Sequence, residues 1–155
     1  MKLVPITPKT MAAKMRSAPD AVEQGMDDAA DAVKKDFEKT TQGWQHSVTF
    51  TIVKKGDDRI ISTDDEVWGF VDEGTRSHLI VARRARVLRF AVGGTPKTQP
   101  GRITSGSGSA GGAVVMRPRV NHPGTKARLF SQQIAKLWTK GTAPFIRDAL
   151  EKHFS

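Results

Sequence analysis

The side chains whose types could support chemistry gather in the stretch FVDEGTRSHLI. This stretch holds Asp72, Glu73 and His78, and the later stretch VNHPGTKAR adds His122. If two strands expected between them pair as a hairpin, these carboxylates and imidazoles could together hold the metal of a nuclease. No H-E-x-x-H pair, or other spacing with ligands on one helix face, is present. We therefore predict no metal site, no catalytic residue and no cofactor, and keep a metal-dependent nuclease as a remote alternative.

The sequence also lacks the residues for nucleophilic or nucleotide chemistry. It contains no cysteine, which removes thiolate nucleophiles, disulfides and zinc fingers. No G-x-S-x-G elbow occurs, and GSGSAGG has no strand-turn-helix context. The phosphate loop G-x-x-x-x-G-K-[ST] is missing as well. We predict that the protein is not an enzyme.

Arginines concentrate in SHLIVARRARVLRF and in MRPRV, with little aromatic interleaving. This pattern favours contact with phosphates more than base reading or stacking. The alternative is that the arginines line an exposed face or pair with carboxylates. The arginines in question are Arg83, Arg84, Arg86, Arg89, Arg117 and Arg119.

The net charge of +9 is unevenly spread along the chain. Residues 1–75 hold ten Lys/Arg and fourteen Asp/Glu, whereas residues 76–155 hold fifteen and two. A basic face attracts nucleic acid, and opposite charges at the two ends favour head-to-tail contact between copies. Basic residues can also simply keep a protein soluble. Composition does not choose among these uses.

The elements that must position these residues fit one domain, since 155 residues lie within the single-domain size range. No apolar run is long enough for a signal peptide or a membrane span, so we expect a soluble, intracellular protein. Pro5 and Pro8, in a stretch without periodicity, predict a flexible arm over residues 1–16. One domain over residues 17–155 follows it.

Helical periodicity begins after this arm. Val22 and Phe37 lie on one apolar face, which predicts an amphipathic helix over 18–40, capped by Ser17 or Asp20. The stretch WQHSVTFTIVKK alternates and predicts a strand, with GDD as the turn and RIIST as the return strand of a hairpin.

A short helix is expected next. TDDE has the capping-box spacing from Thr63 to Glu66, and Gly74 stands where a left-handed residue would end the helix over VWGFV. An extended conformation of VWGFV remains an alternative, because short apolar runs are ambiguous.

Two strands and two helices complete the predicted fold. VLRFAV and AVVMRPRV predict strands, with Pro118 at an edge or bulge. The Gly/Ser-rich segment 93–112 between them predicts a mobile hairpin loop that projects towards a neighbour. An apolar stripe predicts a helix over 127–139, and a last helix begins near Pro144. The fold class is α+β, with an antiparallel sheet of about four strands, an N-terminal amphipathic helix and two C-terminal helices.

Turn chemistry accounts for the two Gly-Thr stretches. Thr75 and His78 are expected to hydrogen-bond neighbouring backbone rather than bind a ligand. Pro123 favours an extended residue before it, and Gly124 permits positive φ. Thr125 is expected to cap the helix that follows.

Together, VDEGTRSHLI, VLRF and VNHPGTKAR resemble the small head–tail joining proteins of long-tailed bacteriophages, also called neck, minor tail or tail-completion proteins. Those proteins show an acidic residue before Gly-Thr, a basic residue and histidine, an L-x-F strand, V-x-HPGTKA, and a helix opening with Pro-Phe. The matching residues are Glu73, Gly74, Thr75, Arg76, His78, Leu88, Phe90, Val120, His122, Pro123, Gly124, Thr125, Lys126, Ala127, Pro144, Phe145 and Ala149. The helix inserted at 127–139 and the long Gly/Ser loop depart from that pattern.

The resemblance implies a structural virion protein without catalysis or cofactor. It would form a homo-oligomeric, hexameric ring around the DNA channel and connect the capsid connector or head-closure protein to the tail tube or tail-terminator protein. Its location would be the neck or tail end of the virion, and the host cytoplasm during assembly, with no membrane partner. Alternatives are a tail-terminator ring that caps the tail tube and a basic nucleic-acid-binding module. Candidate subunit or DNA-channel contacts are Asp72, Arg83, Arg84, Arg86, Arg89, Arg117, Arg119, Lys126 and Arg128.

Overall fold

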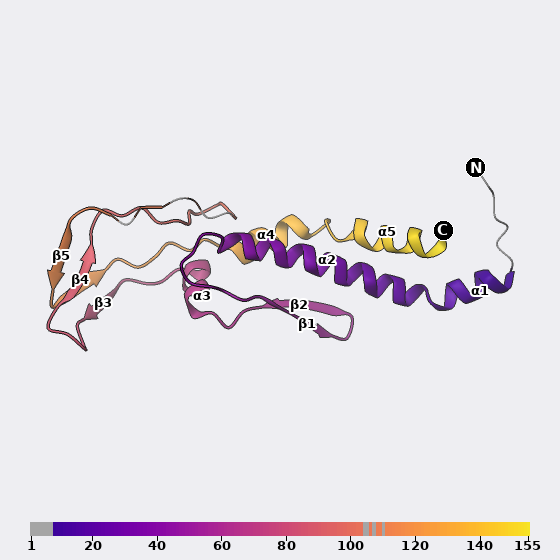
Figure 1. Cartoon of the computed structure of the whole chain (residues 1–155), viewed down its shortest axis with the longest axis horizontal. Helices are drawn as coiled ribbons and strands as arrows, with labels where there is room; N and C mark the ends of the chain where they lie inside the picture. The colour runs from indigo at the N-terminus through magenta and orange to yellow at the C-terminus, as the bar shows by residue number, and fades with distance from the viewer. Residues whose placement is uncertain (1–7, 104–105, 107, 110) are drawn as a thin grey trace. The chain divides into compact units, whose positions relative to one another are not determined.

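The computed structural model describes residues 8–103, 106, 108–109 and 111–155 (Figure 1). Their contacts group into two compact units. Unit 1 comprises the described residues up to Lys35, Thr51–Ser62 and Lys136–Ser155, and unit 2 comprises Asp36–Phe50 and Thr63–Ala135. Helices α2 (Ala18–Thr40) and α4 (Phe130–Trp138) contribute residues to both units. Helices and short antiparallel strands occur together, which confirms the α+β class, while the extent of a single domain stays a prediction.

Unit 1 combines helices with one hairpin. Its elements are α1 (Pro8–Arg16), the first part of α2, β1 (Thr51–Lys55), β2 (Asp58–Ser62), the end of α4 and α5 (Ala143–Phe154). The predicted helix over 18–40 is confirmed, because α2 has these bounds. The last helix begins at the predicted place, with Pro144 in its first turn.

Helix α1 corrects the prediction of a flexible arm for residues 8–16. The Ser17 hydroxyl donates to the carbonyl oxygens of Ala13 at 3.2 Å and Lys14 at 3.3 Å, so Ser17 closes α1. The ring Nε2 of His153 in α5 lies 2.8 Å from the Lys14 carbonyl oxygen and holds the same turn. Residues 1–7 of the predicted arm lie outside the part of the chain that the structure describes.

Close backbone contact between α2 and α5 organises unit 1. Ala29 and Ala30 are buried on α2, and a Cβ added at Gly25 would lie 2.7 Å from the Ile146 Cα and 2.9 Å from the Phe145 carbonyl oxygen. Only glycine allows this approach. On the hairpin side, the Asp27 carboxylate pairs with Lys54 at 2.6 Å and with Arg59. Hydrogen bonds from Lys54 and then Arg59 hold the pKa of the Asp27 carboxyl below its usual range.

The first predicted strand is shorter than its alternating pattern suggested. Residues 51–55 pair with 58–62, but 44–50 do not form a strand. The Trp44 N–H donates to the Thr41 carbonyl oxygen in the turn after α2, and Phe50 is buried in unit 2. The alternating apolar residues of this stretch turn their side chains towards a core. Within the described chain, no strand lies beside 44–50 to form the hydrogen-bonded ladder that a β-strand needs.

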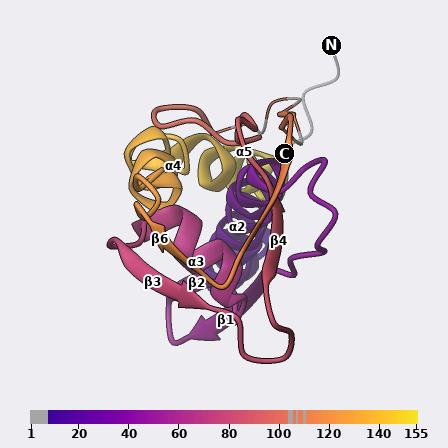
Figure 2. The same cartoon turned by 90° about the vertical axis from the view of Figure 1, so that its left-hand side faces the viewer.

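Unit 2 holds a short helix and two antiparallel ladders. Its further elements are α3 (Glu66–Glu73), β3 (His78–Val81), β4 (Leu88–Ala91), β5 (Val114–Arg117) and β6 (Arg119–His122). Strand β3 pairs with β6 and β4 with β5, so the described strands form three two-stranded sheets where one sheet of about four strands was expected. The separation follows from the residues 82–87, which leave the ladder between β3 and β4. Figure 2 shows β3, β4 and β6 at the near end of this unit.

An aromatic cluster forms the core of unit 2. The Trp68 ring lies 5.8 Å from Phe37, 5.5 Å from Phe50 and 6.4 Å from Phe130, measured between centroids. Its Nε1 donates to the buried Thr40 Oγ1 at 2.9 Å. Phe130 is fully buried, as is Ile134 one turn further along α4. The cluster therefore fixes α3 against the end of α2 and the start of α4.

The predicted short helix is confirmed as α3, but its cap is Asp65 and not Thr63. The Asp65 carboxylate accepts from the Trp68 N–H at 2.7 Å, while Thr63 Oγ1 accepts from the Asp65 N–H at 3.3 Å. Thr63 therefore stabilises the turn before the cap. Gly74 ends α3 with φ of 78°, as predicted.

Helix α4 begins later than the predicted start at residue 127. The N–H groups of Arg128 and Leu129 both donate to the Asp72 carbonyl oxygen at 3.0 Å. Leu129 also has a positive φ of 56°, which an α-helix cannot contain. The segment before Phe130 is thus held against the end of α3.

Candidate functional site

The two Gly-Thr motifs lie against each other in unit 2, although 50 residues separate them. The Thr75 N–H donates to the Thr125 carbonyl oxygen at 2.9 Å. In return, the Thr125 N–H donates to the Thr75 carbonyl oxygen at 3.1 Å and to its Oγ1 at 2.9 Å. The predicted backbone hydrogen bonding of Thr75 is confirmed. The prediction that Thr125 caps the next helix is wrong, because Thr125 belongs to this bridge and α4 starts only at Phe130.

The glycine of each motif makes room for the other motif. Gly74 has φ of 78° and Gly124 has φ of 86°, as predicted for Gly124. A Cβ at Gly74 would lie 2.6 Å from the Thr125 carbonyl oxygen and 2.7 Å from the Ala127 nitrogen. A Cβ at Gly124 would overlap the Thr75 carbonyl oxygen. The two motifs form one structure, which we call the Gly-Thr lock (residues 74–75 and 124–125).

Asp72, two residues before the lock, bonds to the start of α4 inside the unit. Its side chain is buried, and its carboxylate accepts from the Ser131 hydroxyl at 2.6 Å and from the Ser131 N–H at 3.2 Å. A carboxylate at a helix N-terminus satisfies backbone donors there and interacts favourably with the helix dipole. Asp72 thus caps α4, which corrects its assignment as a subunit or DNA contact.

Arg128 is also buried, so its predicted role as a subunit or DNA-channel contact is wrong as well. Its Nε donates to Thr98 Oγ1 at 3.2 Å, and its Nη1 donates to the Lys126 carbonyl oxygen at 2.9 Å. Thr98, itself buried, belongs to the 93–112 loop. At Thr98 the loop therefore contacts its own unit, while residues 93–97 and 99–102 are exposed, and the projection towards a neighbour stays a prediction. Residues 104, 105, 107 and 110 lie outside the described chain.

His78 and His122 face each other at one end of the β3–β6 ladder. Their ring centroids are 5.1 Å apart. His78 Nδ1 lies 2.9 Å from the Arg76 carbonyl oxygen and donates to it, whereas His122 Nδ1 accepts from the Gly124 N–H at 3.1 Å. The predicted backbone bonding of His78 is confirmed. Because His122 Nδ1 is an acceptor, its neutral ring carries the proton on Nε2 and offers no lone pair there to a metal.

The residues of the imagined metal nuclease are therefore only partly assembled. The two histidines meet, but the Asp72 carboxylate is engaged by Ser131, and Glu73 is exposed on the surface. Within the described ranges, no group of three or more histidine, aspartate or glutamate side chains gathers around one point. Of the other residues near the lock, Arg76, Pro123 and Lys126 are exposed.

Beyond the histidines, the two ladders form an arm, defined as residues 78–92 and 113–122. Pairing of β4 with β5 confirms the hairpin expected from the sequence. Val81 pairs with Arg119 and Leu88 with Arg117, so residues 82–87 on one strand face the single residue Pro118 on the other. The Ala82 N–H donates to the Pro118 carbonyl oxygen at 3.1 Å and fixes the start of this excursion. Pro118 thus marks an irregular point in the ladder, as predicted.

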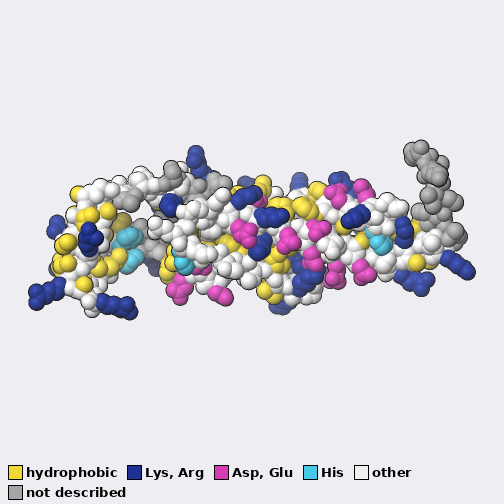
Figure 3. All heavy atoms as spheres, viewed as in Figure 1, with side chains coloured by type: hydrophobic (Ala, Val, Ile, Leu, Met, Phe, Trp, Pro, Cys, Tyr) yellow, Lys and Arg dark blue, Asp and Glu magenta, His cyan; other side chains and the backbone are white. Residues whose placement is uncertain are grey.

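The arginines of the arm are exposed. Arg83, Arg84 and Arg86 lie on the excursion, whereas Arg89, Arg117 and Arg119 lie on the ladders; all six are exposed in the structure. Figure 3 shows Lys/Arg and hydrophobic side chains gathered over this end of unit 2. The prediction that these arginines are available for contacts is consistent with their exposure, while the contacted partner stays a prediction.

The arm also carries an apolar face that sequence reasoning missed. Leu79 and Met116 are 57% exposed, Val114 is 51% and Val81 is 49%. Their ladder partners Asn121, Arg89, Ala91 and Arg119 are exposed on the same side. The consecutive apolar residues of β3 (HLIV) and β5 (VVMR) were the signal for this face, because successive side chains of a strand point to its two opposite sides. We call these four aliphatic side chains, with Arg89 and Arg119, the outer arm face.

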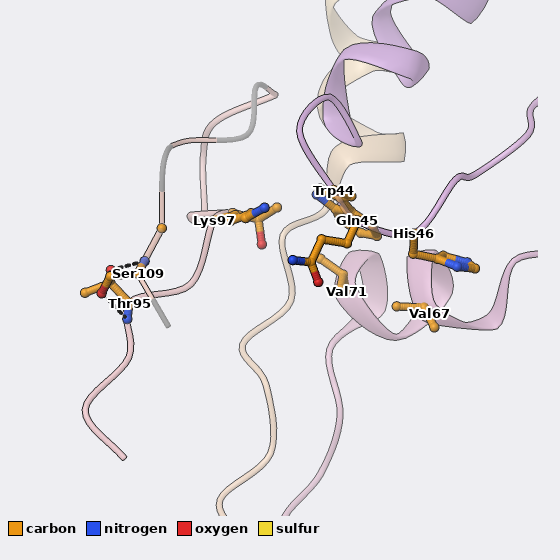
Figure 4. A pocket seen from close by; sticks show the side chains of 10 residues that line it. Trp44, Gln45, His46, Val67, Val71, Thr95, Lys97 and Ser109 are labelled. Atoms are coloured by element: carbon orange, nitrogen blue, oxygen red, sulfur yellow. Dashed lines mark hydrogen bonds between the residues drawn. The ribbon is translucent and has the colours of Figure 1, made fainter. Parts of the chain in front are cut away.

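A pocket of about 700 Å³ in unit 2 lies beside residues 44–46, α3 and the 93–112 loop (Figure 4). Figure 4 shows Gln45 directed towards Lys97, while His46 points to the opposite side. Lys97 Nζ donates to the Gly43 carbonyl oxygen, and the His46 ring pairs with Asp65. His46, followed by the Trp68 N–H, holds the pKa of the Asp65 carboxyl below its usual range. These polar groups bond to the protein and do not converge on a ligand position.

Comparison of the chain with protein-family models, with curated proteins and with solved structures found no match. Within the described residues, every helix is too short or too polar to cross a membrane.

Proposed function

We propose that this protein is a structural virion protein of a tailed bacteriophage. In this role it joins head to tail as a homo-oligomeric ring around the DNA channel, between the connector or head-closure protein and the tail. No catalysis or cofactor is part of this function. Its place is the neck or tail end of the virion, and the host cytoplasm during assembly.

The observation that carries the proposal is the Gly-Thr lock. The residues that resemble head–tail joining proteins are the same residues that fit into one another: each glycine leaves space for the other motif, and the threonines bridge. Each motif is a weak signal alone, but both are needed to form the lock. A chance match to one motif would not produce the lock, so the presence of both supports the resemblance.

The arm supports an assembly role. It combines exposed arginines with half-exposed aliphatic side chains, a combination typical of a protein contact and not of a solvated surface. A ring subunit needs such a surface on each copy.

Electron microscopy of the purified protein, alone and bound to virions from which it has been depleted, tests the function. We expect closed rings, and density at the head–tail junction. Rings only at the free end of tails would favour a tail terminator. A protein that stays monomeric and does not bind depleted virions would refute the proposal.

A nucleic-acid-binding module is the second candidate, favoured by the charge of the arm. Residues 74–147 contain no aspartate or glutamate, and the six exposed arginines of the arm lie among them. In that case the purified monomer binds duplex DNA with a steep salt dependence, and each lost phosphate contact lowers the slope by about one. If DNA is retained only by assembled rings, the arginines serve the channel of a ring.

A further inference from the structure

The outer arm face needs a partner that offers apolar area and negative charge. Its four aliphatic side chains are each about half exposed, and Arg89 and Arg119 lie among them. No carboxylate occurs in the sequence between Gly74 and Arg147 that could neutralise these arginines from within the arm. Exposed aliphatic groups are poorly matched to a phosphate backbone, which protein side chains contact mainly through polar groups. A protein surface fits better.

Helix α3 carries the complementary surface. Phe70 is 56% exposed and Val67 is 49% exposed on this helix. Asp64, Glu66 and Glu73 are exposed beside them, and no lysine or arginine occurs between Arg59 and Arg76. This α3 face (Asp64, Glu66, Val67, Phe70 and Glu73) thus matches the outer arm face in both respects, with opposite charge and similar apolar character.

The two faces stay apart within one copy. Gly74 ends α3, and the lock holds the next residue, Thr75, three positions before β3 begins, so the helix and the base of the arm are joined through a fixed turn. Both faces remain exposed in the single chain. Charge and apolar area left uncovered on one copy can be covered by another.

We propose that the outer arm face of one copy docks on the α3 face of the next copy. The contact joins two different surfaces, so it repeats from copy to copy and produces a ring if the rotation closes. It deepens the proposed function, on which it rests, by naming the two surfaces of the ring contact. Arginine–carboxylate pairs set the register, and burial of Phe70 against the aliphatic side chains contributes the non-polar part.

Cysteine cross-linking of the full chain tests this contact, because the natural sequence contains no cysteine. We pair Met116→Cys with Phe70→Cys in an equimolar mixture under oxidising conditions. We expect a disulfide-linked heterodimer on a non-reducing gel, and a ladder of oligomers when both substitutions are in one chain. The matched control replaces Phe70→Cys by Val53→Cys, since Val53 is 49% exposed but belongs to β1. The control should give at least several-fold less product.

Charge exchange gives a second readout. Glu66→Arg with Glu73→Arg should reduce the cross-link, as should Arg89→Glu with Arg119→Glu, and mixing the two charge-reversed proteins should restore it. Homodimers of Met116→Cys alone would show a symmetric arm contact and overturn the inference. Equal cross-linking to Val53→Cys, or no cross-linking, would overturn it as well.

These outcomes are separable from those of the proposed function. Rings at the head–tail junction without the Met116–Phe70 cross-link leave the function standing and refute the contact. A specific cross-link in a protein that does not bind depleted virions supports the contact and refutes the function.

Discussion

At the residue scale, the Gly-Thr lock depends on two glycines that have no Cβ atom. Gly74 and Gly124 leave open the space that a Cβ would occupy, and each does so at a positive φ. The requirement therefore has two parts, the backbone conformation and the contact with the opposite motif. Glycines elsewhere in the chain allow these parts to be measured separately.

Gly74→Ala should destabilise the protein more than Gly93→Ala. Both glycines have φ of 78°, but a Cβ at Gly93 meets nothing within 4 Å. Gly93→Ala should cost about 1–2 kcal/mol for the left-handed conformation. Gly74→Ala should cost a further ~1–3 kcal/mol, because ψ of 174° places Gly74 in a region essentially restricted to glycine and because backbone atoms of the opposite motif must move. Chemical denaturation measures both, and equal losses would mean that the lock yields easily.

Asp27 should make stability depend on pH. Its folded pKa is lowered by Lys54 and then Arg59, so the charged form stabilises the fold. This contribution is present above the unfolded pKa of about 3.9 and is lost as the pH falls through the lower folded value. The melting temperature of Asp27→Asn should therefore lie below that of the natural protein at pH 6. The difference should shrink below pH of about 4.

Asp28→Asn is the control for that measurement, because it removes an exposed carboxylate from the same helix while sparing the hairpin contacts. A pH-independent difference between Asp27→Asn and the natural protein would show that the pairs with Lys54 and Arg59 contribute nothing to folding.

At the element scale, one hydrogen bond joins the end of α2 to α3. The Trp68 Nε1 donates to Thr40 Oγ1, and the Thr40 hydroxyl donates to the Phe37 carbonyl oxygen at 2.6 Å. Thr40 is fully buried. The bond therefore connects two elements of the aromatic cluster without access to water.

Thr40→Val should cost about 1–3 kcal/mol, because it keeps the side-chain shape and leaves the buried Trp68 N–H without an acceptor. Thr41→Val removes a comparable hydroxyl, which donates to the Glu38 carbonyl oxygen at 3.0 Å in an exposed hydrogen bond at the turn after α2. The control should change stability by less than about 0.5 kcal/mol. Similar losses in thermal unfolding would contradict a specific role for the Trp68 bond.

Sequence patterns were sufficient where the signal is local. The apolar period over 18–40, the stop at Gly74 and the proline near the start of α5 each predicted an element that the structure contains. The strand expected from residue 44 failed because alternation does not show whether a partner strand exists. The N-cap of α3 is Asp65 and not the predicted Thr63. Both side chains offer an oxygen, and their positions in the sequence do not show which one reaches the Trp68 N–H.

The candidate site shows the same division. The Gly-Thr motifs, His78 and the exposed arginines could be selected from their types. Asp72 and Arg128 could not be recognised as buried, because their partners Ser131 and Thr98 lie 59 and 30 residues away. The apolar sides of the arm required knowledge of which face turns inward.

At the scale of the whole molecule, charge is separated along the chain, and assembly should respond to it. Reversing Arg83, Arg84 and Arg86 to glutamate should weaken self-association, and the remaining association of the natural protein should also fall as salt is raised. Sedimentation and electron microscopy measure ring formation. The electrostatic part of the proposal is wrong if rings form equally well.

The matched control reverses three exposed lysines of unit 1, Lys9, Lys35 and Lys152, which changes the net charge by the same amount. Association should persist in this variant. An equal loss in both variants would point to net charge alone, and not to the arm.

The excursion at 82–87 has a consequence for how this protein can vary. The β5–β6 side passes this point through Pro118 alone, and the register on both sides of it is set by pairs that do not include the excursion. Residues can therefore be added or removed between Ala82 and Leu88 without shifting any ladder pair. The length and charge of this segment can therefore change while the strand pairs keep their register. An epitope tag placed there would label the arm without unfolding it.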